Sequence, residues 1–299
     1  MMEKKYKLTD ETIHHFGKIL YRIEALCDFS DIEEGKKGGF IESENNLSQE
    51  GECWVYDNAK VFDNACIYGD ACIFDEVQVR DNAQVYGHAF ILDDVEICDN
   101  ASVFEDARVE DSSVIGGSAQ IYGLAHILGA PYISGYVKIY DHAWIDGRVC
   151  IKNDVRVYDY ANILDSACIS DTARIYEKAI VKGSASISGD SRIYGDSEVT
   201  GYARIHDAEV RNNSDYIVFK NWWSSGRYFT WTRCNNMWRV GCFYGTGRQL
   251  ITKAYKDSEL SGREYERIVR YVEAINHPVN PVKRLNRIQR IVCKIFKIR

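Results

Sequence analysis

The strongest constraint on the fold is a six-residue period that runs from Gly51 to His206 without insertion or deletion. This array holds 156 residues, or 26 hexads, and its fifth position, from Val55 to Ile205, is always Val or Ile. The third position is Ala, Val, Ser, Cys or Pro, and Asp, Asn and Gly are common at the first two. A short fixed period is the signature of a solenoid, in which each repeat contacts only its neighbours. The sequence therefore predicts a mainly β rod.

The period also predicts which side chains are buried. If three hexads form one triangular coil, residues 18 apart stack about 4.8 Å from each other, which is the ordinary spacing of strands. Positions three and five then point into the core, and positions four and six point outward. Asp, Gly and Asn at position one supply the corner conformations that other residues resist. We expect a parallel β-helix of about nine coils.

A resemblance supports the same fold. The segment from Gly38 to Ser48, followed by Gly51-Glu52-Cys53-Trp54-Val55, resembles the beginning of a family of uncharacterised bacterial and phage hexapeptide-repeat proteins. Some members are named acyltransferases because of their fold. The similarity covers about two thirds of the chain, and it implies a left-handed parallel β-helix but no particular reaction.

The parts outside the array predict further structure. Segment 1–50 reads as a β cap over the first coil, with its best strand at Leu20–Leu26. Segment 207–277 reads as an aromatic-rich α+β domain, with an antiparallel sheet in 215–247 that turns near Asn235 and Asn236, and helices at 248–256 and 262–275. Segment 278–299 reads as a basic amphipathic helix.

Charge is unevenly distributed along the chain. The array has 12 basic and 25 acidic residues, whereas the residues from Asp207 onward have 18 basic and 8 acidic ones. Such asymmetry indicates an anionic partner, or docking of one part on another. For the basic C-terminal helix three roles stay open: packing on the acidic array or another copy, binding a partner protein, or lying on an anionic membrane.

Cysteine use and hydropathy favour a cytoplasmic protein. The ten cysteines include no CxxC pair, which is typical of reduced thiols, although Cys150 and Cys168 are 18 residues apart and could meet on adjacent coils. The first residues are polar, and no apolar run approaches the roughly 20 residues that span a bilayer. We expect neither a secretion signal nor a transmembrane segment.

One predicted face carries an aromatic residue at position six in eight successive coils. These residues are Tyr68, Tyr86, Phe104, Tyr122, Tyr140, Tyr158, Tyr176 and Tyr194. In the later coils position four of that face is basic, with Lys138, Arg156, Arg174 and Arg192. Stacked identical side chains can simply stabilise a parallel sheet, or the face can be covered by another part of the protein or by a second chain. Alternatively, the face binds a protein, a nucleotide or a polyanion, because aromatic rings stack on bases and guanidinium groups bind phosphate.

An enzymatic alternative rests on histidine. Acyltransferases of the resembled fold generally use a His as general base with an acyl-coenzyme A donor, often beside a loop that projects from a coil, and the array has no such loop. His126, outward beside Trp144, is the candidate; a surface histidine without function is the other interpretation. His88 and His142 lie three coils apart, too far to cooperate. We expect no metal site and no resident cofactor. The leading hypothesis is a non-enzymatic binding or scaffold protein, with acyl-coenzyme A-dependent acyl transfer as the alternative.

Overall fold

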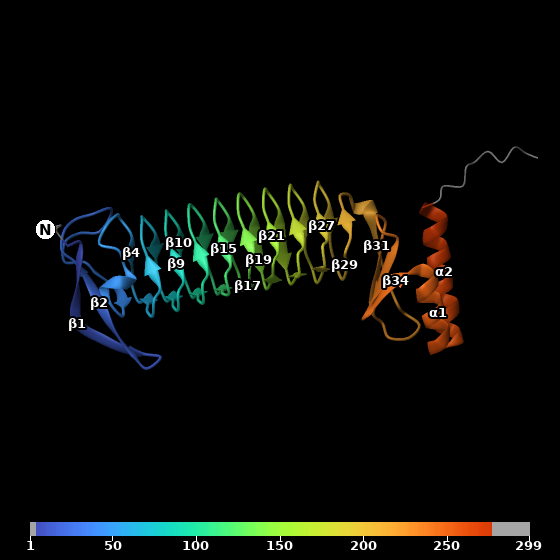
Figure 1. Cartoon of the computed structure of the whole chain (residues 1–299), viewed down its shortest axis with the longest axis horizontal. Coiled ribbons are helices and arrows are strands. Elements are labelled where there is room, and N and C mark those ends of the chain that lie inside the picture. The colour runs from blue at the N-terminus through green and yellow to red at the C-terminus, as the bar shows by residue number, and fades with distance from the viewer. Residues whose placement is uncertain (1–3, 277–299) are drawn as a thin grey trace, which may run out of the picture. The chain divides into compact units, whose positions relative to one another are not determined.

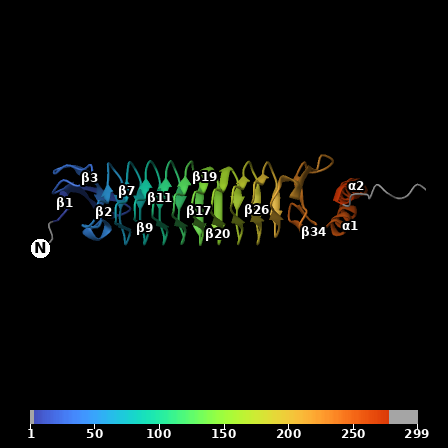
Figure 2. The same cartoon turned by 90° about the horizontal axis from the view of Figure 1, so that it is seen from above.

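A computed structural model describes residues 4–276, so the helix predicted for 278–299 lies outside the described residues. The described chain is mainly β and forms a parallel β-solenoid, whose coils lie side by side in Figure 1 and, seen from above, in Figure 2. Each coil contributes one short strand to each of three sheets. The mainly β fold and the parallel solenoid are confirmed.

The first sheet is continuous with the N-terminal cap, and we call its solenoid part the cap face. Its strands, in spatial order, are β1 (Tyr6–His15), β2 (Lys18–Ala25), β3 (Lys37–Ile41), β5 (Lys60–Val61), β8 (Gln78–Val79), β11 (Glu96–Ile97), β14 (Val114–Ile115), β17 (Tyr132–Gly135), β20 (Cys150–Asn153), β23 (Cys168–Ile169), β26 (Ser186–Ser188) and β29 (Arg204–His206).

The second sheet, the histidine face, contains His126. Its strands are β4 (Trp54–Val55), β7 (Cys72–Ile73), β10 (Phe90–Ile91), β13 (Arg108–Val109), β16 (His126–Ile127), β19 (Trp144–Gly147), β22 (Asn162–Asp165), β25 (Ile180–Val181) and β28 (Glu198–Val199).

The third sheet, the tyrosine face, carries the aromatic series. Its strands are β6 (Cys66–Ile67), β9 (Gln84–Val85), β12 (Ser102–Val103), β15 (Gln120–Ile121), β18 (Lys138–Ile139), β21 (Arg156–Val157), β24 (Arg174–Ile175), β27 (Arg192–Ile193) and β30 (Glu209–Val210).

Positions three and five fill the interior, as the period predicts. Ala71 and Ile73 are fully buried, for example, and so are their equivalents along the array. The solenoid has about ten turns rather than nine, because it extends beyond the array at both ends. Strand β3 pairs in parallel with β5, and β30 pairs with β27 after a one-residue shortening, so that Arg192 faces Glu209.

The corners explain why the array is acidic. Many position-one residues have a positive φ, and their carboxylates accept the backbone N–H of the residue 18 positions later; Asp159, for example, accepts from Glu177 at 3.0 Å. The other carboxylates in this arrangement are Asp63, Asp75, Asp81, Asp93, Asp99, Glu105, Asp111, Asp141, Asp165, Asp171 and Glu177. Asp and Asn tolerate the left-handed conformation better than most residues, and a carboxylate gives a strong acceptor.

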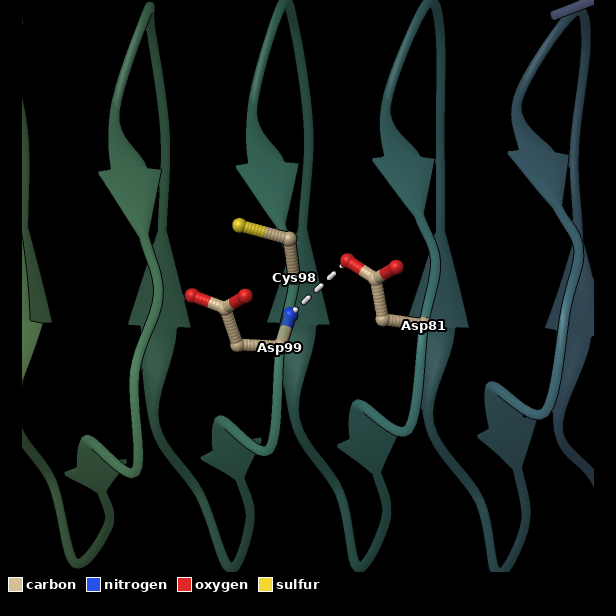
Figure 3. Close-up of side chains that lie close together, drawn as sticks. All are labelled: Asp81, Cys98 and Asp99. Carbon is tan, nitrogen blue, oxygen red and sulfur yellow. Dashed lines mark hydrogen bonds between the residues drawn. The ribbon is translucent and has the colours of Figure 1, made fainter.

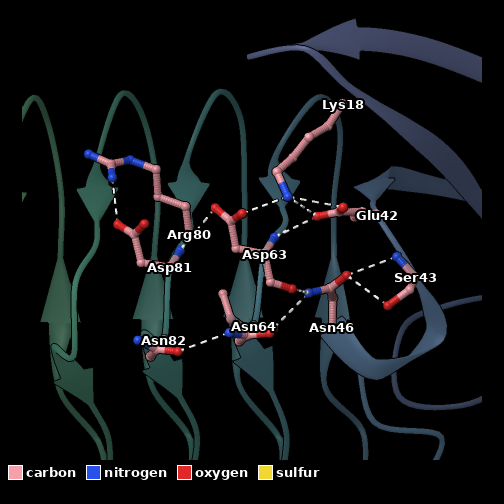
Figure 4. Close-up of polar contacts among 10 residues, drawn as sticks. Lys18, Glu42, Ser43, Asn46, Asp63, Asn64, Arg80, Asp81 and Asn82 are labelled. Carbon is pink, nitrogen blue, oxygen red and sulfur yellow. Dashed lines mark hydrogen bonds and ion pairs between the residues drawn. The ribbon is translucent and has the colours of Figure 1, made fainter.

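The cap is joined to the first coils by a polar network (Figure 4). Strands β1 and β2 form an antiparallel pair, and Lys18 of β2 lies 2.8 Å from Glu42 and 2.6 Å from Asp63. Glu42 also accepts the backbone N–H of Asp63 at 2.7 Å. The side-chain amide of Asn46, in the short 3-10 helix η1 (Glu44–Asn46), donates to the carbonyl of Ala65 at 2.8 Å. The predicted strand at Leu20–Leu26 falls within and just beyond β2.

Beyond the solenoid, a 3-10 helix η2 (Asn213–Asp215) leads into an antiparallel sheet of four strands. They are β31 (Tyr216–Lys220), β32 (Tyr228–Thr232), β33 (Met237–Val240) and β34 (Phe243–Thr246). Asn236 has the positive φ expected of the predicted turn. Two helices follow, α1 (Gly247–Asp257) and α2 (Glu259–Asn276), at the predicted places.

The chain divides into two compact units. The first extends to Lys220 and includes Arg227–Tyr244, so most of the antiparallel sheet belongs with the solenoid. Among the described residues, the second consists of Asn221–Gly226 and residues 245–276, including both helices. Neither described helix is long and apolar enough to cross a membrane.

Candidate functional site

The aromatic series on the tyrosine face forms one continuous stack. From Tyr68 to Tyr194, successive ring centroids are 4.7–5.1 Å apart and the planes differ by only 1–6°. All the rings are partly exposed. We call this column, Tyr68, Tyr86, Phe104, Tyr122, Tyr140, Tyr158, Tyr176 and Tyr194, the tyrosine ladder. The sequence prediction that these side chains share one face is confirmed.

The stacking determines what the ladder can offer a ligand. Each internal ring has both π faces against its neighbours, so only ring edges and phenolic hydroxyls are exposed along the column. A nucleotide base therefore cannot stack between ladder rings without separating them. The face presents hydrogen-bonding hydroxyls rather than a flat aromatic platform.

A column of cations lies beside the ladder. Lys138, Arg156, Arg174 and Arg192 are register partners on β18, β21, β24 and β27. Arg192 lies 3.5 Å from Glu209, whereas the other three form no ion pair with the residues that the structure describes. Most cations of the earlier coils are paired, Lys60 with Glu76 and Arg80 with Glu96 among them. Like charges directly opposite each other destabilise a sheet, and Lys138, Arg156 and Arg174 have no ion pair among the described residues that would offset their repulsion.

Both burial and the neighbouring cations change the pKa of the ladder tyrosines. Burial is the main cause that raises the pKa of Tyr122, Tyr140 and Tyr158, and nearby Arg156 partly offsets the rise in all three. The phenols stay protonated, and able to donate hydrogen bonds, at neutral pH.

His126 has a defined partner that the sequence did not indicate. Its Nε2 lies 2.7 Å from Oε1 of Glu110, and its ring meets Trp144 edge to face at a centroid distance of 4.5 Å. The imidazole side chain is 22% exposed and the Glu110 side chain 15%. A carboxylate that holds one imidazole nitrogen fixes the ring and leaves the other nitrogen for proton transfer. Glu110 precedes His126 by 16 residues, which places a position-six side chain beside the position-four side chain of the next coil on the same face; Arg80–Glu96 and Lys182–Glu198 have the same spacing.

The other array histidines are engaged separately. His88 lies between Asp70 and Asp106, 3.4 and 3.3 Å away, and His142 stacks on Tyr160 at 4.7 Å. The structure therefore does not bring these two histidines together, in agreement with their sequence spacing. Cys150 and Cys168 are register partners, yet both are free thiols.

Three potential ligand groups approach each other at one corner (Figure 3). Asp81, Cys98 and Asp99 place a carboxylate oxygen or sulfur each within 4.8 Å of the others. Asp81 accepts the N–H of Asp99 at 3.1 Å, and Asp99 accepts that of Gly117 at 2.7 Å. Burial raises the pKa of the Cys98 thiol to about 11. The corner hydrogen bonds and the protonated thiol account for this cluster, and we assign it no metal.

These features define the class of protein as a parallel β-solenoid of hexapeptide repeats, with a stacked aromatic ladder and a neighbouring cation column. Part of the chain is similar to a curated protein. Over 73 residues the chain is 40% identical to the protein named "Uncharacterized acetyltransferase YdcK" from Escherichia coli strain K12, which corresponds to 21% of this chain and 22% of that protein. The chain thus matches about a fifth of the relative's length. No protein-family model matches the chain.

Proposed function

We propose that this protein is a non-enzymatic binding or scaffold protein that binds a linear polyanion, or an acidic segment of a partner protein, on its tyrosine face. The binding residues in this proposal are Tyr122, Tyr140, Tyr158, Tyr176 and Tyr194 together with Lys138, Arg156, Arg174 and Arg192. A phage-type protein that captures a host factor is a narrower form of the same proposal.

The uncompensated cation column supports the proposal most directly. Lys138, Arg156 and Arg174 repeat once per coil on adjacent strands, and the described residues supply no acid to pair with them. An anionic chain laid along the solenoid axis would relieve the repulsion between neighbouring cations at each coil.

The ladder geometry narrows the type of partner. Because internal ring faces are occupied by stacking, the tyrosines would act through hydroxyl hydrogen bonds at the regular spacing of the coils. A polymer with anionic groups and acceptor oxygens in sequence fits this arrangement better than single bases that need aromatic faces.

Inorganic polyphosphate is a suitable probe for this face. The triple variant Lys138→Gln/Arg156→Gln/Arg174→Gln should bind it at least ten times more weakly at low salt. The plot of log affinity against log salt concentration should become shallower by about two, because roughly 0.7 counterion is released per neutralised charge on a single strand. Isothermal titration calorimetry at several salt concentrations measures both quantities.

The triple variant Lys60→Gln/Arg80→Gln/Arg108→Gln is the matched control. It removes the same number of positive charges, but each of these cations is paired with an acid in the structure. Its polyphosphate affinity should remain close to that of the parent protein. Equal losses in both triple variants would mean that only net charge matters, and the proposal would be wrong.

Acetyl transfer is a second candidate function, supported by the His126–Glu110 pair and by the name of the matched relative. In this reaction an acceptor amine attacks the thioester carbonyl of acetyl-coenzyme A, His126 takes the proton from the amine, and the coenzyme A thiol leaves. With a panel of amines, thiol release should be lost in His126→Gln but kept in His142→Gln. Absence of enzyme-dependent release with the parent protein would reject this candidate.

A further inference from the structure

A pocket opens within the first unit, where the last coils of the solenoid meet the antiparallel sheet. Its volume is about 370 Å³, within the range of about 300–1,000 Å³ that is usual for small-molecule sites. The lining residues carry hydroxyl, phenol and guanidinium groups and no carboxylate. They are Ser184, Ser186, Tyr202, Arg204, Arg227 and Tyr228.

The pocket results from a change in side-chain size between two coils. Ser186 of β26 is the register partner of Arg204 of β29, and Ser184 precedes Tyr202 by one coil. Small side chains in one coil therefore lie next to large ones in the following coil, and both line the pocket.

The antiparallel sheet supplies the opposite side. The backbone N–H of Arg204 donates to the hydroxyl of Thr230 on β32 at 2.8 Å, and Thr230 is buried. This contact holds the start of β32 against β29, so that the ring of Tyr228 stacks on Tyr202 with centroids 4.4 Å apart. Arg227, next to Tyr228, is thereby brought to the same pocket as Arg204.

The two guanidinium groups are available to a ligand. Arg204 and Arg227 are exposed, and neither forms an ion pair with any residue in 4–276. In a protein with a net charge of −7, two unpaired cations beside two serine hydroxyls form a local site made largely of donors. A phosphate monoester dianion matches it, because guanidinium groups bind phosphate oxygens in pairs and hydroxyls donate to the remaining oxygen.

The ring of Tyr202 can stack on a planar group of a ligand in this pocket. Its side chain is 52% exposed, and Tyr228 is its one stacked neighbour in the described part of the chain. The other face of the ring has no aromatic contact with any residue that the structure describes. We propose that this pocket binds a small molecule that carries both a phosphate monoester and a planar ring, as a nucleoside monophosphate does. The site is separate from the tyrosine face and does not depend on its function.

Titration calorimetry with AMP, adenosine and inorganic phosphate tests the proposal on the full chain. AMP should bind more tightly than either fragment. The variant Arg204→Gln/Arg227→Gln should weaken AMP binding at least tenfold, whereas Tyr202→Ala should weaken AMP binding but leave phosphate binding unchanged. AMP affinity should also fall as the pH drops through about 6, where the phosphate loses its second charge.

Two controls separate this site from others. Arg148→Gln/Arg239→Gln removes two arginines outside the pocket and should not change AMP binding. The Lys138→Gln/Arg156→Gln/Arg174→Gln variant should also keep AMP binding, whatever happens to its polyphosphate affinity. The proposal is overturned if millimolar AMP gives no saturable binding to the parent protein, or if the Arg204→Gln/Arg227→Gln variant, with an unchanged melting temperature, binds AMP as the parent does.

Discussion

At the scale of single residues, many of the acids of the array have a backbone role. The Asp159 carboxylate, for example, caps the N–H of Glu177, one coil further on. Such acids stand where the chain needs a left-handed corner and an acceptor at the same time. The strongly negative array therefore follows in part from its corner chemistry, and its net charge by itself does not identify a partner.

At the corner formed by Asp63, a lysine of the cap changes the pKa of the corner carboxylate. The ammonium group of Lys18 is the largest cause that holds the pKa of Asp63 below its usual value, and the N–H of Asp81 contributes as well. The carboxylates of Asp63 and Glu42 in turn raise the pKa of Lys18. A lowered Asp pKa means stability that is present above about pH 4 and lost as the pH falls through the folded-state pKa. A raised Lys pKa means stability that is present below about pH 10 and lost above it.

The variant Lys18→Met should therefore have a lower melting temperature than the parent protein, with the largest difference between about pH 4 and pH 10. Thermal unfolding followed by circular dichroism across this range measures the difference. Lys7→Met, which removes a cap lysine paired with Glu24 outside the network, is the control. A Lys18→Met difference that does not shrink as the pH falls below 4 would show that the carboxylates of Asp63 and Glu42 are not what makes Lys18 stabilising.

At the scale of elements, the tyrosine ladder joins successive coils outside the core. The column is regular because one hexad position recurs every 18 residues on parallel strands in register. Its hydroxyls are proposed to bind a partner because cations lie beside them. Its stacked rings stabilise the sheet whether or not a partner binds.

The variant Tyr158→Ala should lower the free energy of unfolding by about 1–3 kcal/mol, because it removes two stacked ring pairs worth about 0.5–1.5 kcal/mol each. The raised pKa of Tyr158, caused mainly by burial, indicates that its contribution is present below about pH 10 and is lost as the pH rises through the folded-state pKa. Chemical denaturation at pH 7 and pH 11 should give a smaller difference at the higher pH.

Tyr136→Ala is the matched control, since Tyr136 is 69% exposed and has no ring contact among the described residues. Its effect at pH 7 should be within about 0.5 kcal/mol of zero, as is usual for surface substitutions. If both variants lose the same free energy, ring stacking does not stabilise the column.

At the scale of the whole molecule, the repeat makes most of the first unit predictable. In a solenoid each coil contacts only the next, so the period fixes the core, the three faces and the columns on each face. The period did not predict the extension from about nine to about ten turns. Strands β3 and β30 continue the solenoid, but their sequences do not follow the strict hexad pattern.

The sequence alone determined the parallel solenoid, its buried positions and the alignment of the tyrosines with Lys138 and the arginines. It could do so because each coil has 18 residues, so residues that are 18 positions apart in the sequence are neighbours on adjacent coils. Only the tertiary structure brought Arg204 to Arg227, whereas the His126–Glu110 pair has the same 16-residue spacing as Arg80–Glu96 and so follows from the repeat. The position of Arg227 depends on the docking of a sheet that does not repeat, and no period encodes that docking.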